Sequence, residues 1–274
     1  MGIIRLGPAG IGVGCKGSST TDGIKYVHEI GLNAMEIEFV RGVKMSIELA
    51  EQCGKIAKEL DIELSVHAPY FINLCSTERA KVIASEKRIL DSVGRAHAMG
   101  AKVVVYHPGY YGKMSVQQAY DAVKEATKEI LEKMKEKKIK VNLGMETTGK
   151  HSAFGTLDEI VKLCKQLKQC VPVIDFAHIY ARQGGKINYD KVLDAIKQLR
   201  LKHLHTHFSN IEFTDKGERR HLALDSKPSF KSLAKELLKR RLNITIISES
   251  PILEKDSLKM KRMLERLGYT KWRN

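Results

Sequence analysis

The sequence lacks the features of several protein classes. Its five cysteines include no Cys-x-x-Cys pair and are odd in number: Cys15, Cys53, Cys75, Cys164 and Cys170. They indicate reduced intracellular thiols rather than a disulfide framework or a cysteine zinc site. No apolar run approaches the roughly 18 residues of a membrane span, and the N-terminus has no basic-then-apolar signal pattern. We expect a soluble, cytoplasmic protein with no membrane partner.

Acidic residues are scarce relative to basic ones. The chain has 47 Lys and Arg residues against 32 Asp and Glu residues, which gives a net charge of +15. Such a balance fits a heavily solvated, heat-adapted surface, and it equally fits a polyanionic partner. No internal repeat, linker or low-complexity tract interrupts the 274 residues, so we expect a single domain over residues 1–274.

Short apolar runs alternate with longer amphipathic stretches along the whole chain, which is the pattern of repeated β-α units and a parallel sheet. Eight such repeats predict an α/β protein with a single (β/α)8 TIM barrel. The expected strands are about 3–7, 34–39, 62–67, 102–107, 140–145, 171–175, 202–208 and 244–249. The expected helices are about 21–30, 46–60, 77–99, 115–137, 156–169, 188–199, 229–241 and 256–267.

An open, dinucleotide-binding sheet is the alternative fold. It would need a glycine-rich turn between an early strand and a helix, and residues 8–14 (Pro-Ala-Gly-Ile-Gly-Val-Gly) offer the nearest match. These glycines are spaced two apart and no helix opens directly behind them, so a mobile loop over the barrel mouth is the better interpretation.

Ligand-type side chains stand at the carboxyl ends of six expected strands. Glu146 is the clearest case, because it ends a β-prone run and precedes a loop bounded by Gly149. In a parallel barrel all strand carboxyl ends meet at one mouth, where barrel enzymes keep their chemistry. Imidazoles and carboxylates together suit zinc, manganese or iron, and a carboxylate can bridge two ions. One polymetal site is therefore predicted from His67, His107, Glu146, Asp175, His207 and Glu249.

Further histidines accompany this set. His178 follows the sixth strand closely enough to reach the same mouth, and His221 lies in an excursion between the seventh strand and its helix. On the seventh strand, His203, His205 and His207 share one face by the two-residue period. His207 is nearest the carboxyl end and is our predicted ligand, with His205 one layer lower as the reserve candidate.

Seven short segments carry a resemblance to a known family. They are residues 66–74 (Val-His-Ala-Pro-Tyr-Phe-Ile-Asn-Leu), His107-Pro108-Gly109, Glu146-Thr147-Thr148-Gly149, Asp175-Phe176-Ala177-His178, His207-Phe208-Ser209-Asn210, Arg219-Arg220-His221 and Glu249-Ser250-Pro251. Each is weak alone, but the ordered set resembles the endonuclease IV family of apurinic/apyrimidinic endonucleases over nearly the whole chain. That resemblance implies a metal-dependent TIM barrel.

The resemblance also implies how the ligands are distributed. One ion would be bound by His67, His107 and Glu146, and a second by Glu146, Asp175, His207 and Glu249, with Glu146 bridging. A third would take His178, His221 and, in the family, the aspartate of an Asp-x-His motif. Here Arg219 occupies that position, and a guanidinium cannot ligate a metal. Either Glu218 or Asp215 replaces the missing ligand, or the third site is weak or absent. The expected cofactor is therefore two or three zinc ions, with manganese or iron as alternatives.

The implied reaction is hydrolysis of the phosphodiester 5′ to an abasic site in double-stranded DNA, leaving a 3′-hydroxyl and a 5′-deoxyribose phosphate. Glu146 and Glu249 would be catalytic, orienting the attacking water besides holding metal. Tyr70 and Phe71 match residues that enter the DNA at the lesion, Arg41 matches an inserted arginine, and we also expect Arg219 at the DNA. The resemblance suggests a monomer.

Two other functions fit part of this pattern. Sugar isomerases and epimerases of the xylose isomerase-like group resemble the chain at Glu146, Asp175, His207 and Glu249, which match their single-metal site. They need neither the additional histidines nor a basic protein. A non-catalytic DNA-binding relative is the remaining alternative, and Arg219 is the one feature that favours it.

Overall fold

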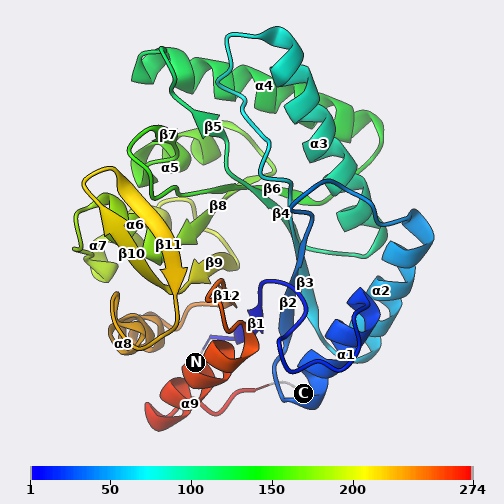
Figure 1. Ribbon diagram of the computed structural model, residues 1–274, viewed down its shortest axis with the longest axis vertical. Coiled ribbons are helices and arrows are strands. Elements are labelled where there is room, and N and C mark those ends of the chain that lie inside the picture. Colours follow the sequence, from blue (N-terminus) through cyan, green and yellow to red (C-terminus); the bar gives the residue numbers. More distant parts are fainter. Residues whose placement is uncertain (1, 273–274) are drawn as a thin grey trace.

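The protein is described by a computed structural model, in which residues 2–272 are placed. Its centre is an eight-stranded parallel sheet in the order β1-β12-β9-β8-β6-β4-β3-β2 (Figure 1). The strands are β1 (Ile4–Pro8), β2 (Ala34–Glu38), β3 (Glu63–His67), β4 (Val103–Tyr106), β6 (Asn142–Glu146), β8 (Cys170–Asp175), β9 (Leu204–Phe208) and β12 (Ile244–Ser248). All eight expected strands are present, and the predicted (β/α)8 barrel is confirmed.

The barrel closes between β1 and β2. The amide of Gly10 donates to the carbonyl of Glu36 at 2.8 Å, and the amide of Asn33 donates to the carbonyl of Leu6 at 3.1 Å. Gly7 allows this approach, because a Cβ at that position would overlap the carbonyl of Ala34. The β1–β2 seam has fewer backbone hydrogen bonds than the other strand pairs, so the barrel is nearly closed but not continuously paired.

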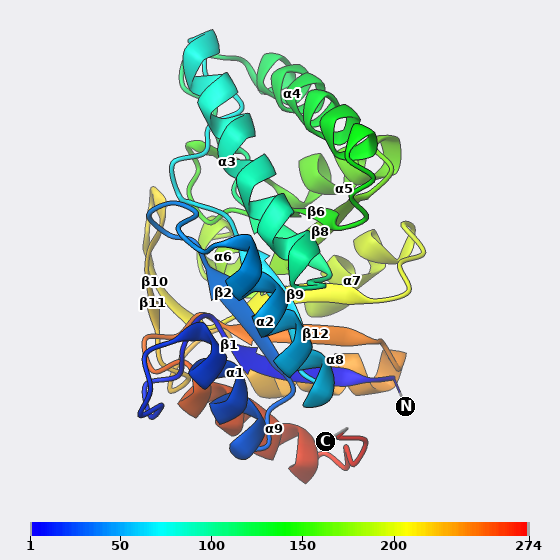
Figure 2. The same ribbon diagram turned by 90° about the vertical axis from the view of Figure 1, so that its right-hand side faces the viewer.

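Nine helices are found among the described residues and surround the strands (Figures 1 and 2). Their bounds are α1 (Thr20–Glu29), α2 (Ile47–Glu59), α3 (Arg79–Ala98), α4 (Val116–Glu136), α5 (Leu157–Gln166), α6 (Phe176–Arg182), α7 (Tyr189–Lys197), α8 (Phe230–Arg240) and α9 (Glu254–Arg266). Helix α5 begins with a capping box, since the Thr156 hydroxyl accepts from the Glu159 amide and the Glu159 carboxylate accepts from the Thr156 amide. No helix within residues 2–272 is long and apolar enough to cross a membrane.

One short helix and two pairs of strands were not expected from the sequence. Helix α6 starts directly at the end of β8, where the Asp175 carboxylate accepts from the His178 amide at 2.7 Å. Strands β5 (Gly109–Tyr110) and β7 (Ala153–Phe154) form a two-stranded ladder, and β10 (Asn210–Thr214) and β11 (Gly217–Leu222) form a hairpin. Strands β5 and β7 have only two residues each, which is too short to show a hydrophobic period.

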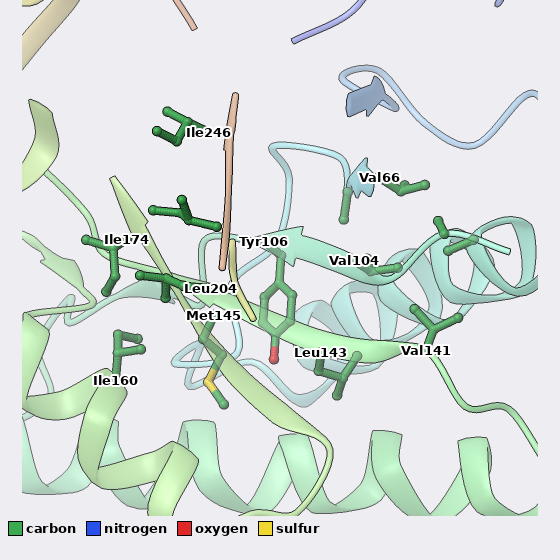
Figure 3. Close-up of a cluster of buried hydrophobic side chains, with 14 of the residues drawn as sticks. Val66, Val104, Tyr106, Val141, Leu143, Met145, Ile160, Ile174, Leu204 and Ile246 are labelled. Atoms are coloured by element: carbon green, nitrogen blue, oxygen red, sulfur yellow. The ribbon is translucent and has the colours of Figure 1, made fainter. Parts of the chain in front are cut away.

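The apolar core lies outside the barrel, between strands and helices. Figure 3 shows one part of it, where Val104 and Tyr106 of β4 lie near Leu143 and Met145 of β6. Because successive residues of a strand face opposite sides, the intervening positions point into the lumen. The apolar cluster of the lumen is small and consists of Val103, Val105 and Val173 with Val171. The lumen is therefore largely polar, which frees it for chemistry.

Candidate metal centre

Glu146 ends β6 and is completely buried at the barrel mouth. Its Oε2 atom lies 2.8 Å from His107 Nε2 and 3.3 Å from His67 Nε2. Its Oε1 atom lies 3.1 Å from His178 Nδ1 and 3.3 Å from His207 Nδ1. Each carboxylate oxygen therefore faces a different pair of imidazoles, which is the arrangement that a bridging carboxylate requires.

Three groups of ligand-type side chains meet at this mouth, and within each group the donor atoms lie within 4.8 Å of one another. The groups are His67, His107 and Glu146; Glu146, Asp175, His207 and Glu249; and Asp175, His178, His221 and Glu249. Glu146, Asp175 and Glu249 each belong to two groups and so connect them. The structure thus brings together all eight residues that the sequence proposed as metal ligands.

Three of the histidines have one ring nitrogen hydrogen-bonded to a neighbouring oxygen atom, and a fourth, His207, has one nitrogen close to a carboxylate. His67 Nδ1 lies 2.8 Å from the Ala68 carbonyl, and His178 Nδ1 lies 2.9 Å from the Thr147 carbonyl. His221 Nδ1 lies 2.8 Å from Ser209 Oγ, and His207 Nε2 lies 2.8 Å from Glu36 Oε1. These neighbours orient the rings so that the other nitrogen is available to a metal ion.

The carboxylates of the cluster fit cations better than they fit the protein alone. Asp175 is fully buried, and its Oδ2 atom has no hydrogen-bond partner among residues 2–272. Burial raises the pKa of Asp175 to about 6. For Glu146, burial favours the neutral acid, but the charges of His107 and His207 outweigh it and hold the pKa well below its usual range. A buried, anionic oxygen set beside oriented imidazoles is a suitable site for divalent ions.

Zinc binding to the metal-free protein is expected to release protons. Burial lowers the pKa of His67, but the hydrogen bond to Glu146 and the charge of Glu38 outweigh it and raise the pKa to about 10. His67 therefore carries a proton near neutral pH, and that proton must leave before the ring can ligate. Calorimetric zinc titrations at neutral pH in buffers of different ionisation enthalpy measure the release. A binding heat that is the same in every buffer would contradict this prediction.

His207, rather than His205, stands at the mouth. The Nδ1 atom of His207 lies 3.4 Å from Glu249 Oε1, whereas His205 Nε2 lies 2.9 Å from Glu36 Oε2, one layer deeper. The interpretation of His205 as a buried polar residue below the site therefore agrees with its position. Ser65 also donates to Glu36 Oε2, at 2.7 Å, so Glu36 is the centre of a polar layer beneath the cluster.

Sequence reasoning missed Glu36 and Glu38. Both lie on β2, and Glu38 Oε1 has no hydrogen-bond partner among the described residues. The desolvation of Glu38 raises its pKa to about 8. The signal was available, because a buried strand with the sequence Ala-Met-Glu-Ile-Glu places two carboxylates on one face. No histidine accompanied them in the sequence, so they did not suggest a ligand set.

The Glu36→Gln variant is expected to weaken binding of the ion nearest His207 by about 10- to 100-fold, because the carboxylate that orients this ring is lost. Competition for zinc against a chromophoric chelator measures the affinity. Ser65→Ala is the matched control, since Ser65 contacts Glu36 at Oε2 and not the oxygen that faces His207. Unchanged zinc affinity in Glu36→Gln would show that His207 is held by packing alone.

The residues expected at DNA lie around the same opening. Tyr70 and Phe71 are 57% and 69% exposed, although the Tyr70 ring remains 5.8 Å from the His67 ring in an edge contact. Arg41 is exposed in the loop after β2. Arg219 is also exposed, and it forms an ion pair with Glu212. A cavity of about 380 Å³ lies beside Tyr70, and Glu38, His221 and Glu249 also line it.

Residues 24–267 match the family described as the xylose isomerase-like TIM barrel, and the chain belongs to that family. Within it, the resemblance to endonuclease IV is confirmed. The chain is 30% identical over 203 residues to a probable endonuclease 4 from Mycoplasmopsis pulmonis (strain UAB CTIP), covering 70% of this chain and 72% of that protein. It is 37% identical over 265 residues to an uncharacterized protein of Methanocaldococcus jannaschii, covering 93% and 95%.

Solved structures share the fold at lower identity. Endonuclease IV from Thermus thermophilus superposes with a TM-score of 0.70 at 19% identity, covering 92% of this chain and 95% of that one. A D-tagatose 3-epimerase-like protein superposes with a TM-score of 0.72 at 20% identity, covering 90% and 92%. The fold is therefore common to proteins named for two different reactions, and the choice between them depends on the site.

Proposed function

We propose that this protein is a metal-dependent phosphodiesterase that cleaves DNA on the 5′ side of an abasic site. The observation that carries the proposal is the linkage of three ligand groups through Glu146, Asp175 and Glu249. A single-metal sugar epimerase has no use for two further groups built on His67 and His107 or on His178 and His221. A phosphodiester does, because its attacking oxygen, its non-bridging oxygens and its leaving oxygen all need charge stabilisation.

The residues of the chain divide this work. His67, His107 and Glu146 would hold one ion, and Glu146, Asp175, His207 and Glu249 a second. Bound divalent ions supply positive charge and lower the pKa of water. Glu249, whose side chain is 17% exposed towards the cavity, would orient the attacking water and accept its proton. Glu146 is fully buried between the imidazoles and would hold the ions in position to bind the phosphate.

The surroundings of the site supply the DNA contacts. The exposed pair Tyr70 and Phe71 can stack on bases next to the lesion, and Arg41 lies in the adjoining loop, since the Tyr70 amide donates to the Val40 carbonyl. Turning a nucleotide out of the duplex costs least where the base is already missing. The net charge of +15 favours the phosphate backbone in a salt-dependent way. Lesion selectivity then needs no reading of base edges.

A 3-epimerase acting on a sugar remains the second candidate. The group Glu146, Asp175, His207 and Glu249 is complete by itself, and it opens on a cavity large enough for a monosaccharide. This alternative leaves four buried or half-buried histidines around Glu146 without a role.

A labelled duplex carrying one abasic-site analogue tests the proposal. Zinc- or manganese-loaded protein is expected to nick the strand directly 5′ to the analogue and to leave a 3′ end that a polymerase extends. An undamaged duplex of the same sequence is the control. The proposal fails if fully metal-loaded protein leaves the damaged duplex intact, and interconversion of ketohexose epimers by that preparation would establish the second candidate.

A further inference from the structure

Strand β11 contains an irregularity at the position where a metal ligand was expected. The β10–β11 hairpin pairs Glu212 with Arg220 and Phe213 with Glu218, so Arg219 is an extra residue without a partner on β10. In an unbroken strand, residues two apart share a face, and Arg219 would lie on the side of His221. One inserted residue reverses this alternation. The bulge therefore turns Arg219 away and places Glu218 on the face of His221.

The side-chain contacts agree with this shift of register. Arg219 lies 64% exposed and forms an ion pair with Glu212 at the surface. Glu218 is only 17% exposed, and its Oε2 atom lies 3.4 Å from His178 Nε2. The same nitrogen of His178 lies 3.3 Å from His221 Nε2. His178 Nε2 thus lies next to an oxygen of Glu218 and to a nitrogen of His221.

The His178 nitrogen that faces Glu218 is the one left available by hydrogen bonding. His178 Nδ1 is held by the Thr147 carbonyl and His221 Nδ1 by Ser209, so the Nε2 atom of each ring is open to a ligand. Asp175 and Glu249 approach these two rings only on their Nδ1 sides, at 3.7 and 3.8 Å. Glu218 is consequently the carboxylate nearest the available nitrogen of His178.

The loop after β6 is shaped to hold Glu218 in place. The Glu218 amide donates to the Gly149 carbonyl at 3.1 Å, and Lys150 forms a β-bridge with Gly217. A Cβ on Gly149 would lie 2.6 Å from both Cβ and Oε2 of Glu218 and 3.2 Å from the His178 ring. Glycine is therefore required at this position for the Glu218 carboxylate to lie against His178.

We infer that Glu218 is a metal ligand, which completes a cation site with His178 and His221 and takes the place that Arg219 cannot fill. Figure 2 shows the hairpin that carries Glu218 beside α6, which carries His178, on the side opposite the N-terminus. Because imidazole and carboxylate donors are mixed, the site suits zinc or manganese. The inference deepens the proposed function and rests on it, since this ion would add positive charge next to the ligand groups that contain Glu146.

Metal titration without DNA tests this inference separately from nuclease activity. Glu218→Gln keeps the shape of the side chain and is expected to weaken the most loosely held zinc ion by about 100-fold or more, with the other ions unchanged. When cobalt replaces zinc, Glu218→Gln should lose the visible absorption of the cobalt ion that His178 and His221 bind in the wild type. Asp215→Asn, in the same hairpin but without a contact to the cluster, is the matched control and should titrate like the wild type.

Two further variants separate this register from the unbulged one. Gly149→Ala keeps the Glu218 charge but displaces it, and should weaken the same ion as Glu218→Gln does. Arg219→Asp should leave the zinc titration unchanged, because position 219 faces Glu212 at the surface. The inference is overturned if Glu218→Gln binds every ion as the wild type does, or if Arg219→Asp tightens the weakest site. Equal thermal unfolding of the metal-free proteins excludes misfolding as the cause.

Discussion

The Glu146→Gln variant is expected to lose incision of an abasic duplex by about 10³-fold or more and to bind fewer metal ions than the wild type. In the wild type, the two carboxylate oxygens of Glu146 face four imidazoles. The glutamine amide offers one weak donor oxygen in place of these two anionic ones. Losing about 4 kcal/mol of charge stabilisation in the transition state corresponds to that change in rate. Single-turnover incision together with metal analysis of the purified variant measures both effects.

Glu48→Gln is the control for this substitution, because Glu48 is an exposed carboxylate in the first turn of α2 and belongs to none of the ligand groups. It should keep wild-type incision and metal content. If Glu146→Gln lost its ions but cut at the wild-type rate, the bridging position of Glu146 would be irrelevant to hydrolysis. If it kept every ion and every activity, the assignment of the cluster as a metal centre would be wrong.

The double variant Tyr70→Ala/Phe71→Ala is expected to lower incision at limiting DNA by about 10²-fold while leaving the metal content unchanged. Stacking of an aromatic side chain on a base contributes about 1 to 3 kcal/mol, both rings are more than half exposed, and Tyr70 lines the cavity. Because the truncated rings carry little buried area, thermal stability should change little. Binding to a lesion-bearing duplex by fluorescence anisotropy, compared with the undamaged duplex, locates the loss in lesion recognition.

Val116→Ala provides the comparison, since Val116 is 61% exposed at the start of α4 and contributes apolar surface without lining the cavity. It should bind and cut like the wild type. Equal loss of affinity for damaged and undamaged duplexes in the aromatic variant would mean that Tyr70 and Phe71 act as a general surface contact and not at the lesion.

Much of the fold could be predicted from the sequence because strands and helices here follow their local signals. The run from Val103 to Tyr106 is apolar throughout and ends at a histidine, and Thr156 carries its capping partner three residues later. The convergence of Glu146, His67 and Asp175 followed from topology, since all carboxyl ends of parallel strands meet at one end of the barrel. Long-range pairing was therefore implied by a regular local pattern.

The remainder of the site depends on contacts that the sequence does not contain. Nothing near Glu36 indicates that it would face His207, far along the chain, because the pairing depends on which residues of distant strands share a layer. The bulge at Arg219 also could not be predicted from the sequence, since the pairing of β11 with β10 decides whether β11 holds an extra residue. The two-residue period alone would therefore place Glu218 on the face opposite His221.

The pairing of β1 with β12 has a consequence for how the barrel assembles. Ile4 pairs with Ile244, so the first strand waits for the last one before it gains its ladder partner. Glu249 follows that last strand immediately and belongs to the group that contains Glu146. A polypeptide that ended before β12 would thus carry Tyr70 and Phe71 but would lack Glu249, one of the proposed metal ligands.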